Sequence, residues 1–187
     1  EQNSDPRFLS KEDRFDPCRV KHFTEYLNLA DVRKALHVRE EHAPKEWSLC
    51  APDSRFTFDN GDNLKSQIYL YKDLIKRAKT TNKDLKMMVY SGDDDSVCAL
   101  MGTQYWIYDI GAETIEDKLW QPWEVKGQVA GYLTEFDLGN ETNSKLLLAT
   151  VHGAGHEVPM YRPEEALEML IAFFSDEWPI LKKKSAQ

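Results

Sequence analysis

Two segments of the sequence carry residues that could do acid–base chemistry. Residues 151–159, VHGAGHEVP, place His156 after an apolar run and behind three small residues. Residues 90–98, YSGDDDSVC, place three successive aspartates after another apolar run. A carboxylate beside an imidazole fixes the tautomer of the ring and stabilises the imidazolium that forms when the ring accepts a proton. The two segments together therefore predict a general base, which needs a nucleophile to serve.

No serine of the chain has the setting of such a nucleophile. In hydrolases built on an α/β sheet the triad runs Ser, Asp, His, and the serine lies in a G-x-S-x-G turn between strand and helix. The order Asp then His is present, but Ser91 follows Tyr90 at the end of a predicted strand. Cys98 with His156 as its base is an alternative, although a cysteine that opens a helix more often packs.

Metal binding is the other chemistry that these residue types allow. The aspartates do not form a calcium loop, because the glycine and terminal glutamate of an EF-hand are missing downstream. His152 and His156 are four residues apart, as ligands on a helix would be, but Gly153 and Gly155 make a helix improbable and H-E-x-x-H is absent. We expect no metal and no cofactor, and a solvated turn remains the alternative interpretation of the aspartates.

Composition limits the class of protein. The chain has 187 residues, 41% apolar and 30% charged, with a net charge of -8. This length suits one domain that buries roughly two-thirds of its surface. An acidic chain does not favour nucleic acid as a partner, because phosphates require a basic face. No run approaches the ~18 apolar residues of a membrane span, so we expect a soluble globular protein.

The cysteines and one sequon leave the compartment open. Cys18, Cys50 and Cys98 are an odd number without a CxxC pair, which does not fit a structural zinc site. Three free thiols in a cytosolic protein is one interpretation. The sequon at Asn140 would suit a glycosylated surface loop of a secretory protein.

Periodicity and turn signals predict a mixed α/β sheet. We expect helices over 30–38 (capped by Asn28), over 64–79, over 98–110 (ended by Gly111) and from Pro163 onward. We expect strands over 85–90 and 145–151, with a hairpin around Lys126–Gly127 between them. We expect the strand over 85–90 to be buried on both faces. The last helix should face inward with Ala166, Leu167, Leu170, Phe173 and Phe174. Functional side chains collect at the carboxyl ends of strands in such sheets, so the two loops, 61 residues apart, should be neighbours.

The two loop motifs resemble the serine carboxypeptidase family, which includes cathepsin A and carboxypeptidase Y. The motifs are YSGDDDSVC with the following Met101–Gly102, and VHGAGHEVPMYRPEEAL. The resemblance extends to DPC at 16–18, VRKALHV at 32–38, WSLC at 47–50 and QPWEVKGQVAGY at 121–132.

The resemblance implies a fold and its boundaries. Residues 16–181 would be the C-terminal part of an α/β-hydrolase fold, with a mixed, mostly parallel sheet and flanking helices. Residues 1–15 would be a flexible, processed edge and residues 182–187 a basic tail. Several family members are cut into a large and a small chain, and this sequence resembles the small one. A separate large chain would complete the fold and carry the catalytic serine.

The resemblance also assigns residues. Asp95 matches the triad aspartate and His156 the triad histidine, Asp93 matches a preceding loop aspartate and Asp94 falls at a variable position. Two further residues are expected to contact substrate: Cys98, which matches a free cysteine near the active site of some members, and Glu157, which replaces a methionine of other members. Cys18 and Cys50 match cysteines whose disulfide partners lie in the large chain.

The implied function is a serine-type carboxypeptidase that removes C-terminal residues from peptides at acidic pH, in a lysosome or vacuole lumen or outside the cell. Its partners would be the large chain and peptide substrates, and a homodimer of the two-chain unit is compatible with the resemblance. The alternatives are an acyltransferase or lyase on the same triad, and a non-catalytic protective or scaffolding partner.

Overall fold

The computed structural model describes most of the chain, namely residues 19–39, 41–43, 45–50, 61, 65–81, 84–139 and 144–181. It divides into two compact units, Glu1–Lys65 and Ser66–Gln187. The predicted N-terminal edge and the basic tail lie outside the described residues, so those boundaries stay predictions. The division near residue 65 was not among the boundaries that the sequence predicted.

In the first unit the described residues include two short helices, α1 (Arg19–Leu27) and α2 (Ala30–Ala35). The predicted capping role of Asn28 is wrong, because the residue before α2 is Leu29 and makes no side-chain cap. Asn28 instead donates from Nδ2 to the carbonyl oxygens of Thr24 (2.8 Å) and Trp47 (2.9 Å), and its Oδ1 accepts the Trp47 N–H at 2.7 Å. An amide that donates and accepts can join two distant backbone segments, which a cap does not require.

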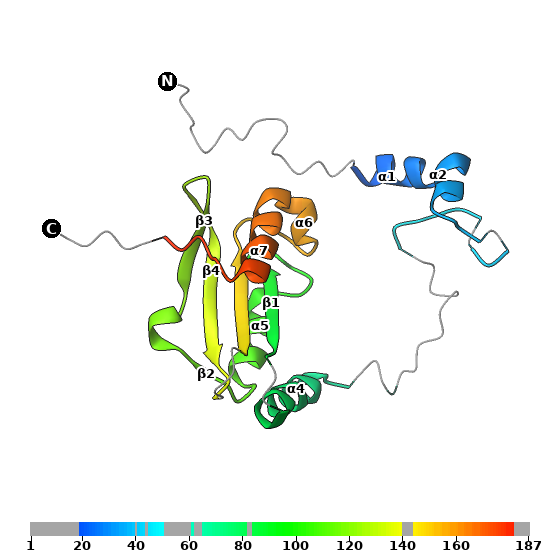
Figure 1. The fold of residues 1–187 in the computed structure, drawn as a ribbon. Helices are drawn as coiled ribbons and strands as arrows, with labels where there is room; N and C mark the ends of the chain where they lie inside the picture. Colours follow the sequence, from blue (N-terminus) through cyan, green and yellow to red (C-terminus); the bar gives the residue numbers. More distant parts are fainter. Residues whose placement is uncertain are drawn as a thin grey trace, which may run out of the picture. The chain divides into compact units, whose positions relative to one another are not determined.

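The second unit is built on a mixed sheet of five strands: β1 (Lys86–Gly92), β2 (Glu113–Thr114), β3 (Gln121–Val125), β4 (Gln128–Asp137) and β5 (Lys145–Val151). The order is β1-β5-β4-β2, and β3 also pairs with β4 (Figure 1). The prediction of a mixed sheet is confirmed, as is the strand over 145–151.

The expected predominance of parallel strands is wrong for the described residues. Only β1 and β5 run parallel, whereas β4 is antiparallel to β2, β3 and β5. The reason is the connections: the predicted two-residue turn at Lys126 and Gly127, with φ of 51° and 74°, forces β3 and β4 to run antiparallel. The chain between β1 and β5 contains a helix and a hairpin, which is long enough to allow a parallel return.

Helices cover both faces of the sheet. They are α4 (Ile68–Thr81), α5 (Leu100–Tyr108), α6 (Val158–Tyr161) and α7 (Pro163–Ser175), with a 3-10 turn, η2 (Glu116–Lys118), between β2 and β3. One apolar cluster joins Leu147, Ala149 and Val151 of β5 to α6 and α7, and another joins Leu146 and Leu148 of β5 to α4 and α5. Alternate side chains of a strand point to opposite faces, so β5 contributes residues to the apolar cluster on each face of the sheet.

Three details of the elements differ from the sequence prediction. The strand β1 was expected to be buried on both faces, but it is the terminal strand of the described order, most of its side chains are half-buried, and Tyr90 is exposed. The predicted helix ending at Gly111 stops earlier: its C-cap is Asp109, and Gly111 follows two residues later with φ of 89°.

The third difference is the inward face of α7. The helix starts at Pro163 as predicted, but three of the residues expected to face inward are exposed: Leu167, Leu170 and Phe174. The buried residues are Ala166, Met169 and Ala172, with Phe173 partly buried. The inner face of α7 thus combines two alanines with Met169 and Phe173, while Leu167, Leu170 and Phe174 lie on the outer face.

An aspartate ties the end of α7 to the starts of both parallel strands. Asp176, the C-cap of α7, lies 2.9 Å from Lys86 Nζ and 3.1 Å from Lys145 Nζ. Lys86 Nζ also donates to the carbonyl oxygen of Phe173 at 2.8 Å. Hydrogen bonds from the two lysines lower the pKa of Asp176. A folded-state pKa below the unfolded value of about 3.9 stabilises the fold above that pH, and the stabilisation is lost as the pH falls through the folded pKa.

Asp176 has φ of 62°, a left-handed conformation that asparagine also tolerates. We predict that Asp176→Asn lowers the free energy of unfolding at pH 7 by about 1 kcal/mol, because the pairs are partly exposed. The measurement is the melting temperature as a function of pH, and the difference from the parent should shrink as the pH falls below about 3.9. Asp109→Asn, at the C-cap of α5, is the matched control. Equal losses in the two variants would contradict the role of the ion pairs.

Candidate active site

The parallel pairing of β1 and β5 brings the two predicted loops together. The register places Gly92 opposite Val151, the last residue of each strand. The next residues, Asp93 and His152, therefore leave the sheet at the same edge. The prediction that the aspartate loop and the histidine loop are neighbours is confirmed.

The backbones of the two loops are in direct contact. Asp93 N–H donates to the carbonyl oxygen of Val151 at 3.1 Å, and Asp94 N–H donates to that of Ala154 at 3.0 Å. A Cβ on Gly92 would lie 2.1 Å from the Ala154 oxygen, so only glycine allows this approach. The contact between the loops thus requires a glycine at position 92, whereas the glycines before the histidine make room for Arg162 at Gly153 and for Tyr161 at Gly155.

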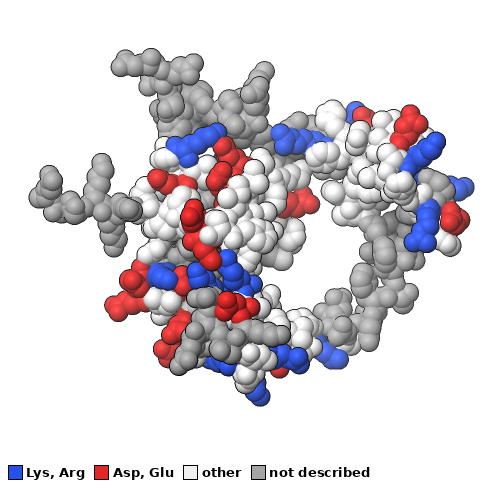
Figure 2. Space-filling model, viewed as in Figure 1, with Lys and Arg blue, Asp and Glu red and all other residues white. Residues whose placement is uncertain are grey.

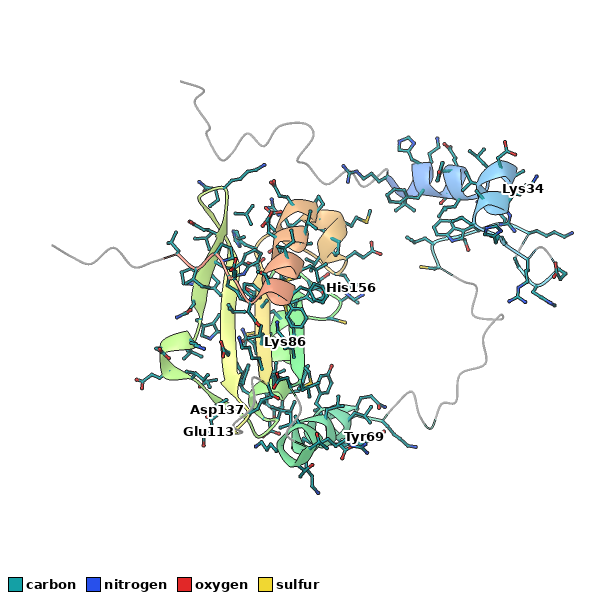
Figure 3. All side chains as sticks on the ribbon, viewed as in Figure 1. Lys34, Tyr69, Lys86, Glu113, Asp137 and His156 are labelled. Carbon is teal, nitrogen blue, oxygen red and sulfur yellow. The ribbon has the colours of Figure 1, made fainter. Side chains whose placement is uncertain are left out.

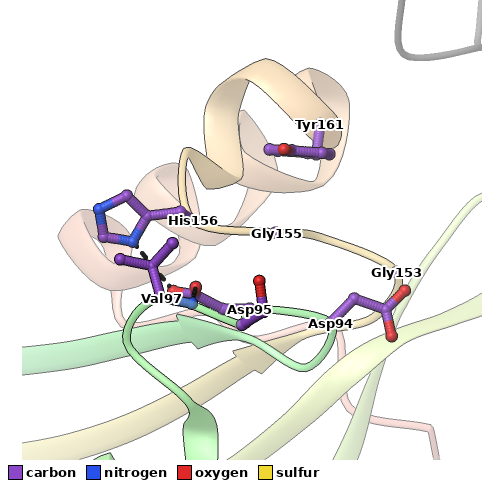
Figure 4. A pocket seen from close by; sticks show the side chains of 8 residues that line it. Asp94, Asp95, Val97, Gly153, Gly155, His156 and Tyr161 are labelled. Carbon is purple, nitrogen blue, oxygen red and sulfur yellow. Dashed lines mark hydrogen bonds and ion pairs between the residues drawn. The ribbon is translucent and has the colours of Figure 1, made fainter. Parts of the chain in front are cut away.

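The Asp95 carboxylate is held by three hydrogen bonds. Oδ1 accepts from the N–H groups of Val97 (2.7 Å) and Cys98 (3.0 Å), and Oδ2 lies 3.1 Å from His156 Nδ1 (Figure 4). The side chain is only 6% exposed. Burial acts to raise the pKa of Asp95, but the hydrogen bonds from Cys98, Val97 and His156 outweigh it, and the pKa lies below its usual value. The carboxylate is therefore ionised under mildly acidic conditions.

The ionised carboxylate determines what the imidazole of His156 can do. A carboxylate can only accept a hydrogen bond, so Nδ1 must carry a proton. In the neutral ring this leaves Nε2 as the acceptor, and the second ring nitrogen points away from Asp95 (Figure 4). The side chain of His156 is 50% exposed, so a reacting group can reach it.

A small pocket of about 150 Å³ opens beside this pair. It is lined by Asp94, Asp95, Ser96, Val97, Gly153, Gly155, His156 and Tyr161. The ring of Tyr161 packs on Gly155, where a Cβ would lie 2.8 Å from Cζ (Figure 4). Tyr161 and Val97 were not predicted from the sequence. The two closely spaced glycines before His156 were the one feature of the sequence that indicated room for an aromatic ring beside the loop.

The other predicted site residues are placed less closely around the pocket. Cys98 is exposed. Its Sγ, a carboxylate oxygen of Asp95 and a ring nitrogen of His156 all lie within 4.8 Å of one another, but Cys98 does not line the pocket. Glu157 is the N-cap of α6 and does not line it either. Cys50 is exposed and forms no disulfide with Cys98, the other described cysteine. Cys18 and Asn140 lie outside the described residues.

The surface charge and the helix lengths relate to two classes that the sequence did not favour, nucleic-acid-binding and membrane-spanning proteins. Figure 2 shows Asp and Glu side chains interspersed with Lys and Arg side chains over the face in view of the second unit. Among the described residues, no helix is both long enough and apolar enough to cross a membrane.

The site itself indicates a class of protein. An imidazole that is oriented by a carboxylate, at the ends of adjacent parallel strands, is the arrangement found in hydrolases with a Ser–His–Asp triad.

Comparison with known proteins places the chain within this class. A family model described as serine carboxypeptidase matches residues 2–176, and the chain belongs to that family, whose fold is the α/β hydrolase. It is 35% identical over 163 residues to serine carboxypeptidase-like 29 of Arabidopsis thaliana, covering 87% of this chain and 30% of the relative. It is 33% identical over 164 residues to serine carboxypeptidase II-1 of Hordeum vulgare, covering 87% of this chain and 45% of that relative. The chain thus spans less than half the length of these relatives.

We predict that Asp95→Asn reverses the tautomer of His156. The asparagine oxygen would accept from the Val97 and Cys98 amides, so its NH2 group would donate to Nδ1 and the ring proton would move to Nε2. The measurement is ¹⁵N NMR of histidine-labelled protein at a pH where the ring is neutral. The parent should show protonated Nδ1 and Asp95→Asn protonated Nε2. The same tautomer in both proteins would mean that Asp95 does not orient the ring.

Proposed function

We propose that the chain supplies the aspartate and histidine of a serine-type carboxypeptidase, and that the nucleophilic serine lies in polypeptide outside these 187 residues. The observation that carries the proposal is the hydrogen bond between buried Asp95 and accessible His156. The family and the relatives' names support the reaction, and their greater length provides room for a serine and its turn.

In the proposed mechanism His156 acts first as a base and then as an acid. Its Nε2 takes the proton of the serine as the oxygen attacks the peptide carbonyl, and later gives a proton to the leaving amine. Asp95 holds the ring and stabilises the imidazolium. The lowered pKa of Asp95 supports work at acidic pH, because the carboxylate stays ionised there.

The partner and compartment are part of the same proposal. The serine would be carried by a large chain cut from the same precursor and joined through Cys18 and Cys50, which peptide mapping without reduction would test. Such disulfides and glycosylation at Asn140 fit a lysosomal, vacuolar or extracellular enzyme. Mapping that joins Cys18 to Cys50 would contradict the two off-chain bonds.

Substrate choice is proposed to involve the residues beside the pair. Glu157 directly follows His156, and its carboxylate would favour a basic C-terminal residue through a charge-assisted hydrogen bond. Cys98, near both site residues, would contact the substrate as well. Relative rates on peptides ending in Arg and Leu test the first idea, and equal ratios in the parent and Glu157→Met would contradict it.

The full-length enzyme, assayed on blocked dipeptides at pH 5, tests the reaction. We predict that Asp95→Asn and His156→Ala each lower kcat on the order of 10⁴-fold, since each removes the oriented base. Asp109→Asn, remote from the pair on α5, should retain full activity. Acyl transfer to an alcohol without hydrolysis would indicate an acyltransferase. A parent enzyme without turnover would contradict a catalytic role and favour a scaffolding one.

A further inference from the structure

A second carboxylate–imidazole pair joins the same two loops. Asp93 Oδ2 lies 2.6 Å from His152 Nδ1. The two pairs are two residues apart on the aspartate loop and four residues apart on the histidine loop. His152 is 69% exposed, and neither Asp93 nor His152 lines the pocket. This pair therefore lies outside the pocket. Any effect that it has on His156 must be transmitted through the backbone of the two loops.

Asp93 binds the histidine loop by its backbone as well. Its Oδ1 accepts the N–H of Gly153 at 2.6 Å, so both carboxylate oxygens are used. Gly153 has φ of 67°, a conformation that side chains rarely adopt, and its carbonyl oxygen accepts from Arg162 Nε at 3.2 Å. The peptide groups before and after the Gly153 Cα are thus both held by side-chain hydrogen bonds, three residues before His156.

The geometry points to Asp93 as a positioning residue for His156, an inference that rests on the proposed function. Half of the His156 side chain is exposed to solvent, and among the described residues its side-chain hydrogen bond is to Asp95. Packing alone therefore restrains the ring weakly, and its position depends on the path of the loop from Val151. The Asp93–Gly153 bond fixes that path, and a displacement of about 1 Å can cost 10²-fold in rate.

The structure offers a matched control at the other end of the sheet. Asp137 Oδ1 accepts the N–H of Gly139 at 2.6 Å, and Gly139 has φ of 62°. The distance and the positive φ of the glycine match those of Asp93 and Gly153, but this bond spans two residues of one turn, whereas Asp93 and Gly153 are 60 residues apart and join two loops. Asp137 ends β4 beside the start of β5, whereas His156 follows the end of β5 (Figure 3). If the Asp93–Gly153 bond contributed only to stability, loss of either bond would leave kcat unchanged in the folded protein well below its melting point.

The test compares variants of the full-length enzyme by kcat, KM and melting temperature, well below the melting point. Asp93→Ala should lower kcat about 10- to 100-fold with KM within about twofold of the parent. Asp93→Asn, whose amide oxygen can accept from Gly153, should recover most of the loss. Asp137→Ala should keep kcat within about twofold of the parent. If Asp93→Ala does not fold, Asp93→Ser, whose hydroxyl is too short to replace the carboxylate, should show the same loss.

A second readout needs no turnover. The ¹⁵N resonances of His156 should change in Asp93→Ala and stay unchanged in Asp137→Ala. An inactive parent would overturn the proposed function, and the spectra would still decide the role of Asp93. Equal kcat in folded Asp93→Ala and Asp137→Ala, a loss confined to KM, or unchanged His156 resonances would overturn the inference.

Discussion

The parallel pairing of β1 and β5 is the constraint on which the site depends. With Gly92 opposite Val151, both strands end at one edge, and the loops that follow are within hydrogen-bonding distance of each other. A shift of one residue would turn alternate side chains to the other face and separate the loop contacts. The bond from Asp95 to His156 is therefore a consequence of strand register as much as of the residues themselves.

The rest of the second unit maintains that register. Every residue of β5 after Lys145 is buried, and its alternate side chains enter two separate apolar clusters. Asp176 binds the lysines at the starts of β1 and β5, at the ends opposite to the site. The strands are thus fixed by ion pairs at one end and by loop-to-loop hydrogen bonds at the other. The site can remain ordered although His156 is half exposed.

The sequence predicted those features that local signals determine. The turn at Lys126 and Gly127, the strand 145–151 and the start of α7 at Pro163 follow from glycine, apolar runs and proline. The juxtaposition of the site loops followed from the sheet-edge rule. Features that depend on tertiary partners were missed: the side chain of Asn28 binds Trp47, Met169 and Ala172 are buried in α7 where Leu167 and Leu170 were expected, and Asp93 binds His152. Because α7 carries apolar residues on its exposed as well as its buried face, the periodicity of its sequence did not determine which face meets the sheet.

In the proposed function Asp95 and His156 serve a serine that lies outside these 187 residues. The most direct test of this claim is to treat the assembled full-length enzyme with a phosphonyl fluoride and to locate the label by peptide mass spectrometry. A serine beyond this chain should be labelled, His156→Ala should suppress the labelling, and residues 1–187 expressed alone should take up none. A label on a serine of this chain or on Cys98 would contradict the claim.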